Sequence, residues 1–101
     1  MSRLFIIIAR DKPDSLELRM ANRPAHLDHA RSLGDRIKVA GPLLTPGDDP
    51  KPCGSVLIIE AEDLASARAF AEADPYAQAG LFESVTVAPW NAVLGQWVAA
   101  S

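Results

Sequence analysis

Leu-Phe-Ile-Ile-Ile-Ala, residues 4–9, is a continuous apolar run rich in β-branched side chains. A second run of the same character, Ser-Val-Leu-Ile-Ile-Glu-Ala, occupies residues 55–61. Apolar residues at both odd and even positions are typical of strands that are buried on both faces. The two runs therefore predict two central strands of one sheet.

Each central strand is followed by a helical pattern. The first predicted helix covers residues 14–33, begins at Asp14 or Ser15, and is interrupted at Pro24, because proline cannot donate a hydrogen bond to the preceding turn. The second covers residues 64–73, opens at Glu62 or Asp63 and is closed by Pro75.

Two further segments, residues 36–40 and 82–88, alternate between apolar and polar positions and predict half-exposed strands. Residues 41–54 contain four prolines and predict a long loop that acts as a lid or is disordered. The resulting order is strand, helix, strand, strand, helix, strand. This βαββαβ order predicts an α+β, ferredoxin-like fold, with an antiparallel four-stranded sheet and both helices on one face.

Helices on one face leave the other face of the sheet open. An open face of large apolar side chains exceeds what soluble monomers usually expose, so we expect a homodimer formed through it. The apolar tail, residues 91–101, is expected to pack on the partner or on the open edge. We expect one domain at residues 1–95, followed by a C-terminal tail at residues 96–101.

The composition narrows the class of protein. The chain has 101 residues, 49% of them hydrophobic, and a net charge of −3, with its ten lysines and arginines dispersed. Dispersed basic residues argue against nucleic-acid or anionic-membrane binding. No apolar run is long enough to span a bilayer and no secretory signal is evident, so we expect a cytoplasmic protein. The single cysteine, Cys53, cannot form an internal disulfide.

One histidine and one carboxylate fall where the helical pattern turns inward. If a helix begins at Pro24, His26 lies within its apolar stripe, and Asp74 lies one turn beyond Phe70 on the stripe of the second helix. A buried carboxylate needs a hydrogen-bond donor, and His26 is the predicted partner of Asp74. The alternative is a structural hydrogen bond that only holds two helices together.

The expected setting of His26 favours proton transfer. In the first turn of a helix the dipole disfavours the imidazolium, whereas Asp74 favours it. A histidine near its reference pKa of ~6.5, with its tautomer fixed by a carboxylate, can accept or give a proton at neutral pH. This chemistry suits elimination or isomerisation of a small molecule.

Other side chains are candidates for ligand binding. Arg19 and Arg23 lie about one turn apart beside His26 and could hold a carboxylate or a phenolate, although helix arginines are commonly solvated. Tyr76 could hydrogen-bond a ligand or only pack over the helix end. Ser84 and Thr86 share one face of the last strand and could line a cavity or meet the partner sheet.

Two residues are weaker candidates. His29 has the spacing from His26 of a metal-ligand pair, but no third ligand is evident, so we expect no metal and a surface histidine. Cys53 could be a nucleophile, but an incidental loop cysteine is favoured. No phosphate loop, dinucleotide fingerprint or zinc spacing is present, which predicts chemistry without a cofactor.

Four short blocks carry a family resemblance: Arg-Pro-Ala-His-Leu at 23–27, Ala-Gly-Pro-Leu at 40–43, Ala-Asp-Pro-Tyr at 73–76 and Ala-Gly-Leu-Phe at 79–82. In this order and spacing they resemble the YciI-like, or YCII-related, family over about residues 3–94. The resemblance implies a dimeric α+β barrel whose proposed active site is a His–Asp pair, here His26 and Asp74. It also implies a binding role for Gly41 and Pro42, which otherwise shape the turn after the second strand.

A few relatives in that family resemble enzymes of aromatic breakdown that remove chloride from a hydroxylated ring. We therefore expect a small enzyme with a His26/Asp74 site that performs acid/base lyase or isomerase chemistry on a cyclic or aromatic metabolite. One alternative is a non-catalytic ligand-binding or accessory module. Another is a haem-binding or cofactor-free oxygenase of similar fold, with His26 as ligand or base.

Overall fold

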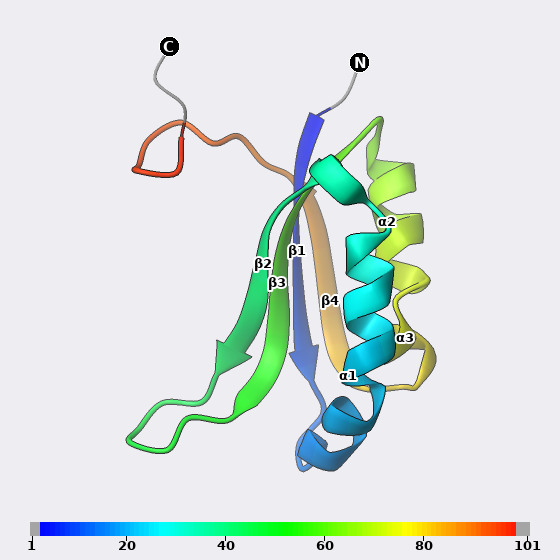
Figure 1. The fold of residues 1–101 in the computed structure, drawn as a ribbon, viewed down its shortest axis with the longest axis vertical. Coiled ribbons are helices and arrows are strands. Elements are labelled where there is room, and N and C mark those ends of the chain that lie inside the picture. The colour runs from blue at the N-terminus through cyan, green and yellow to red at the C-terminus, as the bar shows by residue number, and fades with distance from the viewer. Residues whose placement is uncertain (1–2, 99–101) are drawn as a thin grey trace.

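The computed structural model describes residues 3–98 and contains a four-stranded antiparallel sheet with its helices on one face (Figure 1). In chain order the elements are β1 (Arg3–Asp11), α1 (Leu16–Arg31), the 3-10 turn η1 (Gly34–Arg36), β2 (Ile37–Leu44), β3 (Pro52–Ala61), α2 (Leu64–Glu72), α3 (Pro75–Gln78) and β4 (Phe82–Pro89). The strand order is β2-β3-β1-β4. The predicted ferredoxin-like α+β fold, with the first and third strands in the centre, is confirmed.

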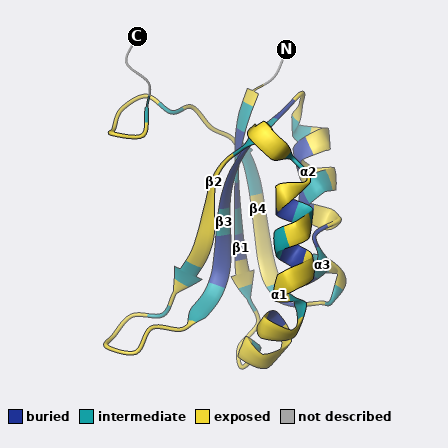
Figure 2. Ribbon diagram, in the orientation of Figure 1, coloured by how far each residue is buried: buried dark blue, intermediate teal, exposed yellow. Residues whose placement is uncertain are grey.

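The core lies between the central strands and the helices. On β1, Phe5 and Ile7 point to the helix side, where they pair with Ile59 and Leu57 of β3, and all four are buried. The side chains between them point to the open face and are mostly only half-buried in the single chain. Figure 2 shows a second contrast, between the buried or half-buried central strands and the largely exposed outer strands β2 and β4.

The predicted interruption of the first helix is wrong. α1 continues through Pro24, which lies on its exposed side, so the missing proline N–H leaves a carbonyl that water can reach. The helix also ends at Arg31, and Gly34 begins η1 instead of terminating α1. His26 consequently lies in the third turn of α1, and the expected effect of a helix N-terminus on its charge does not apply.

The long loop predicted over residues 41–54 is largely a β-hairpin. β2 extends to Leu44 and β3 begins at Pro52, so only residues 45–51 connect them. Pro42 pairs with Ser55 on an edge strand, where a proline needs no inward N–H. Cys53 is therefore a half-buried strand residue and not part of a loop.

The second helical region is split in two. α2 begins after Asp63, whose side chain accepts a hydrogen bond from the Ser66 N–H, and this bond lowers the pKa of Asp63. After α2 ends at Glu72, the short helix α3 begins with Asp74 as its N-cap and Pro75 as its first residue. The sequence predicted the end of α2 but not α3.

The tail leaves the sheet after β4 and curls away from it (Figure 1). Val93, Leu94 and Trp97 are between 75% and 94% exposed, so these side chains do not pack closely on their own sheet. Of the predicted tail at residues 96–101, the last three lie outside the described residues. Within residues 3–98, no helix has both the length and the apolar character needed to cross a membrane.

Candidate active site

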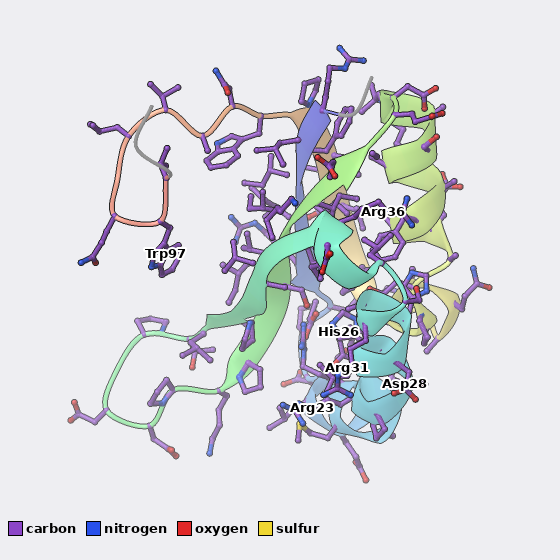
Figure 3. All side chains as sticks on the ribbon, turned by 45° about the horizontal axis from the view of Figure 1, so that its top comes forward. Arg23, His26, Asp28, Arg31, Arg36 and Trp97 are labelled. Atoms are coloured by element: carbon purple, nitrogen blue, oxygen red, sulfur yellow. The ribbon has the colours of Figure 1, made fainter. Side chains whose placement is uncertain are left out.

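A cleft of about 410 Å³ lies between α1 and the β2–β3 hairpin. Because α1 is continuous, Arg19, Arg23 and His26 follow at intervals of four and three residues and share one stripe of the helix, which lines this cleft. In Figure 3, Arg23 and His26 lie toward the hairpin, and Asp28 lies on the other side of α1. The opposite wall comes from the hairpin and includes the predicted Gly41 and Pro42; apart from Ser55 of β3 its side chains are apolar.

His26 and Asp74 are in direct contact below the cleft. The Nδ1 atom of His26 lies 2.9 Å from each carboxylate oxygen of Asp74, and the two residues are 8% and 4% exposed. Asp74 Oδ1 also accepts the Tyr76 backbone N–H at 2.9 Å. The predicted proximity is present, but its origin differs, because Asp74 is the N-cap of α3 and not part of the α2 stripe.

This contact determines which ring nitrogen faces a ligand. An ionised carboxylate only accepts hydrogen bonds, so Nδ1 carries the proton and Nε2 is the basic nitrogen. Among residues 3–98 Nε2 has no hydrogen-bond partner, and no fully buried side-chain nitrogen or oxygen there lacks one. Nε2 is therefore accessible, and the cleft that His26 lines is the space it reaches.

Tyr76 supports the imidazole from one side. The two rings are stacked with centroids 4.0 Å apart and planes 14° apart, and Tyr76 is 1% exposed. Burial raises the pKa of the Tyr76 phenol, and the charges of Arg19 and Arg23 oppose that rise. The phenol is therefore neutral at neutral pH and fixes the plane in which the His26 ring lies.

Arg19 is the centre of a second buried network. Its Nε lies 2.7 Å from Asp11 Oδ2, its Nη2 2.7 Å from Ser55 Oγ, and its Nη1 3.4 Å from the Tyr76 hydroxyl. The Arg19 and Asp11 side chains are each 5% exposed. Arg19 is thus a buried, paired arginine whose guanidinium also lies 4.5 Å from the centre of the Tyr76 ring.

Sequence reasoning missed Asp11 and Ser55. Ser55 is the first residue of the second apolar run, and it shares its face of β3 with Leu57 and Ile59 because side chains alternate along a strand. A hydroxyl at a core-facing position was therefore the available signal. Asp11 ends β1 and carries no comparable signal, since its partner lies eight residues away on α1.

Some predicted candidates lie elsewhere. His29 is half-buried, stacks on Phe70 at 4.2 Å and makes a 2.9 Å hydrogen bond through Nε2 with the Phe70 carbonyl oxygen, so the prediction of a surface histidine is wrong. Ser84 and Thr86 are exposed on β4 and do not line the cleft. Over residues 3–98 no group of three or more potential metal ligands comes together.

Comparisons with known proteins agree with this architecture. The model of the YCII-related domain matches residues 3–91. Protein YciI of Escherichia coli O6:H1 is 45% identical over 96 residues, which cover 89% of this chain and 98% of that protein. An uncharacterised protein of Haemophilus influenzae is 37% identical over 97 residues, covering 88% and 97%.

Among solved structures, a 5-chloro-2-hydroxyhydroquinone dehydrochlorinase from Burkholderia phenoliruptrix, in complex with 2,5-dihydroxybenzoquinone, is 40% identical with a TM-score of 0.83. The match covers 87% of this chain and 93% of that one. An antibiotic biosynthesis monooxygenase with a TM-score of 0.53 and 16% identity shares the fold alone. On the match over residues 3–91 and the identity to these relatives, the chain belongs to the YCII-related family.

Proposed function

We propose that this protein is a small lyase-type enzyme that performs acid/base elimination or isomerisation on a hydroxylated cyclic or aromatic compound. The observation that carries the proposal is the accessible His26 Nε2 in the cleft, with Nδ1 held by the buried carboxylate of Asp74. The 40% identical dehydrochlorinase supports the reaction class.

In the proposed elimination, His26 Nε2 removes a proton from a hydroxyl or a carbon of the ring. Before this step a second ring hydroxyl becomes a carbonyl and its proton is taken up by the carbon that bears the leaving group, so that this carbon is saturated. The electron pair of the O–H or C–H bond broken by Nε2 then forms a new double bond in the ring system, the bond from the saturated carbon to the leaving group breaks, and the leaving group departs with its bonding pair. The net change is loss of one H–X molecule from the substrate. Asp74 stabilises the imidazolium that forms, and the proton then passes from Nε2 to solvent.

Ser55 and Tyr76 are proposed to orient the substrate. Both hydroxyl oxygens accept hydrogen bonds from Arg19, so their own protons are free to point into the cleft. Hydroxyl or keto oxygens on the ring would accept these protons. All the groups that this reaction uses belong to the chain, and the absence of a cofactor or metal stays a prediction.

The test uses 5-chloro-2-hydroxyhydroquinone as probe. We expect the protein to release chloride from it, measured with an ion-selective electrode, and we expect His26→Gln to release far less, because glutamine has no basic nitrogen. In parallel, NMR in D₂O measures exchange of ring protons of the bound probe. A protein that binds the probe but gives neither chloride release nor exchange above buffer would contradict the enzyme and favour the binding module.

We also propose a homodimer in the cytoplasm, formed through the open sheet face. Leu4, Ile6 and Ile8 of β1 remain half-buried on that face, and Val39 of β2 is 42% exposed. Covering this surface removes apolar area from water. Sedimentation equilibrium at micromolar concentration should give twice the mass of one chain, and Ile8→Asp should shift it toward one chain. A single-chain mass for the unaltered protein would refute the dimer.

A further inference from the structure

The charges that line the cleft are of one sign. Its lining includes Arg19, Arg23 and His26 but no aspartate or glutamate. The chain as a whole is acidic, with thirteen acidic and ten basic side chains. The acidic side chains are therefore excluded from this surface, although they are in excess elsewhere.

Two of these three groups are already paired behind the cleft wall. Arg19 is neutralised by Asp11 at 2.7 Å, and His26 contacts Asp74 at 2.9 Å. Arg23 has no carboxylate within ion-pair distance in the described part of the chain, whereas Arg31 on the same helix pairs with Asp28. Arg23 consequently gives the cleft a positive charge that no neighbouring side chain compensates.

Arg23 is an exposed residue that places this charge on the cleft lining beside His26. Arg23 lies one turn after Arg19 and one turn before His26 on the stripe that faces the hairpin (Figure 3). Its charge also acts on the Tyr76 phenol, on which the His26 ring is stacked. A guanidinium binds an oxyanion more strongly than a neutral oxygen, because the hydrogen bonds are charge-assisted.

We infer that the cleft binds its ring substrate as an anion, with an ionised oxygen substituent against Arg23, and that Arg23 sets the preference for the ionised over the neutral form. This inference rests on the proposed function for the identity of the cleft as a substrate site. It also fits the proposed reaction, because a ring that already carries an oxyanion supplies the electron pair that expels the leaving group.

The test measures binding of 2,5-dihydroxybenzoquinone by isothermal titration calorimetry, at several pH values across the ionisation of this probe. The same molecule is compared in its neutral, singly ionised and doubly ionised states, so its size and substituents stay the same. We expect the unaltered protein to bind the ionised form at least about tenfold more tightly, the size expected for a charge-assisted contact. Arg23→Gln should lose most of this preference.

Two controls separate Arg23 from other causes. Arg31→Gln removes a positive charge from the same helix outside the cleft lining and should keep the preference. 2,5-dimethoxybenzoquinone, which has the same ring but no ionisable hydroxyl, should bind with an affinity that does not change over this pH range, which shows that the pH dependence follows the ionisation of the probe and not that of the protein.

The inference is overturned if the unaltered protein fails to bind the ionised probe, if its affinity is constant across the ionisation, or if Arg23→Gln keeps the full preference. These outcomes are distinct from failure of the proposed function. A preference for the anion without chloride release or proton exchange would overturn the enzyme and keep the anion site. Turnover of 5-chloro-2-hydroxyhydroquinone, together with an affinity for 2,5-dihydroxybenzoquinone that does not change with its ionisation, would keep the enzyme and overturn the anion site.

Discussion

Replacing Asp74 by asparagine is expected to lower turnover of 5-chloro-2-hydroxyhydroquinone by about 100- to 10,000-fold, the range for loss of a correctly protonated general base. The reason lies in the two contacts of the Asp74 carboxylate. Because Oδ1 accepts the Tyr76 N–H, the amide oxygen of the introduced asparagine would take that position and its NH₂ group would face His26 Nδ1. Nδ1 would then accept a hydrogen bond, and the ring proton would move to Nε2.

The measurement compares kcat and affinity for this probe in both proteins. Binding should change little, because the altered atoms lie behind the imidazole and outside the cleft lining. Asp63→Asn is the matched control, since Asp63 is also an N-cap carboxylate that accepts a backbone N–H, on α2 and away from the cleft. Equal turnover in Asp74→Asn and the unaltered chain would show that the carboxylate does not set the tautomer.

Replacing Asp11 by alanine is expected to destabilise the fold by about 3–5 kcal/mol, the usual cost of breaking a buried ion pair from one side. The alanine would leave the guanidinium of Arg19 in a site where it is 5% exposed, without a counter-charge. The hydroxyls of Ser55 and Tyr76 can accept its hydrogen bonds but cannot neutralise it. Urea denaturation followed by circular dichroism measures the free energy of unfolding.

The control for this loss is Asp28→Ala. Asp28 pairs with Arg31 at 3.7 Å on the surface of α1, and its side chain is 82% exposed. Exposed ion pairs contribute less than about 1 kcal/mol, so this variant should unfold close to the unaltered chain. If Asp11→Ala and Asp28→Ala lowered the free energy of unfolding by similar amounts, the buried ion pair of Arg19 would contribute no more to stability than an exposed one.

The central part of the fold was predictable because it depends on apolar patterning. The runs at residues 4–9 and 55–61 are apolar at every position except Ser55 and Glu60, a pattern typical of a strand covered on both sides. The order of strands and helices along the chain then leaves few possible strand orders in one sheet. The strand order β2-β3-β1-β4 follows from these two facts.

The errors come from prolines whose surroundings the sequence does not show. Pro24 lies on the exposed side of α1, and Pro42 lies on an edge strand. At neither place is an N–H required by a neighbouring element, so helix and strand continue. Rules based on local sequence treat each proline as the end of a helix or strand. Whether the missing N–H matters depends on whether a neighbouring element would have bonded to it, and only the folded structure shows this.

The sequence identified most residues of the candidate site, but it did not predict the elements that hold them. Asp74 was expected on the stripe of a helix but instead caps α3, and both positions point it inward. The continuous α1 that joins Arg19 to His26 was hidden by Pro24. Asp11 and Ser55 were not found, because their importance arises only when β1 and β3 lie beside α1.

The cleft has two walls of different chemical character, and they belong to separate parts of the chain. His26 and Asp74, the proposed proton-transfer pair, come from α1 and the N-terminus of α3, while the largely apolar wall opposite them comes from the β2–β3 hairpin. The edge strand β2 and the connecting residues 45–51 can change their side chains or length without disturbing the pairing of the central strands β1 and β3. If the proposed function holds, substitutions in β2 and in residues 45–51 would change which ligand the cleft accepts and leave His26 and Asp74 in place.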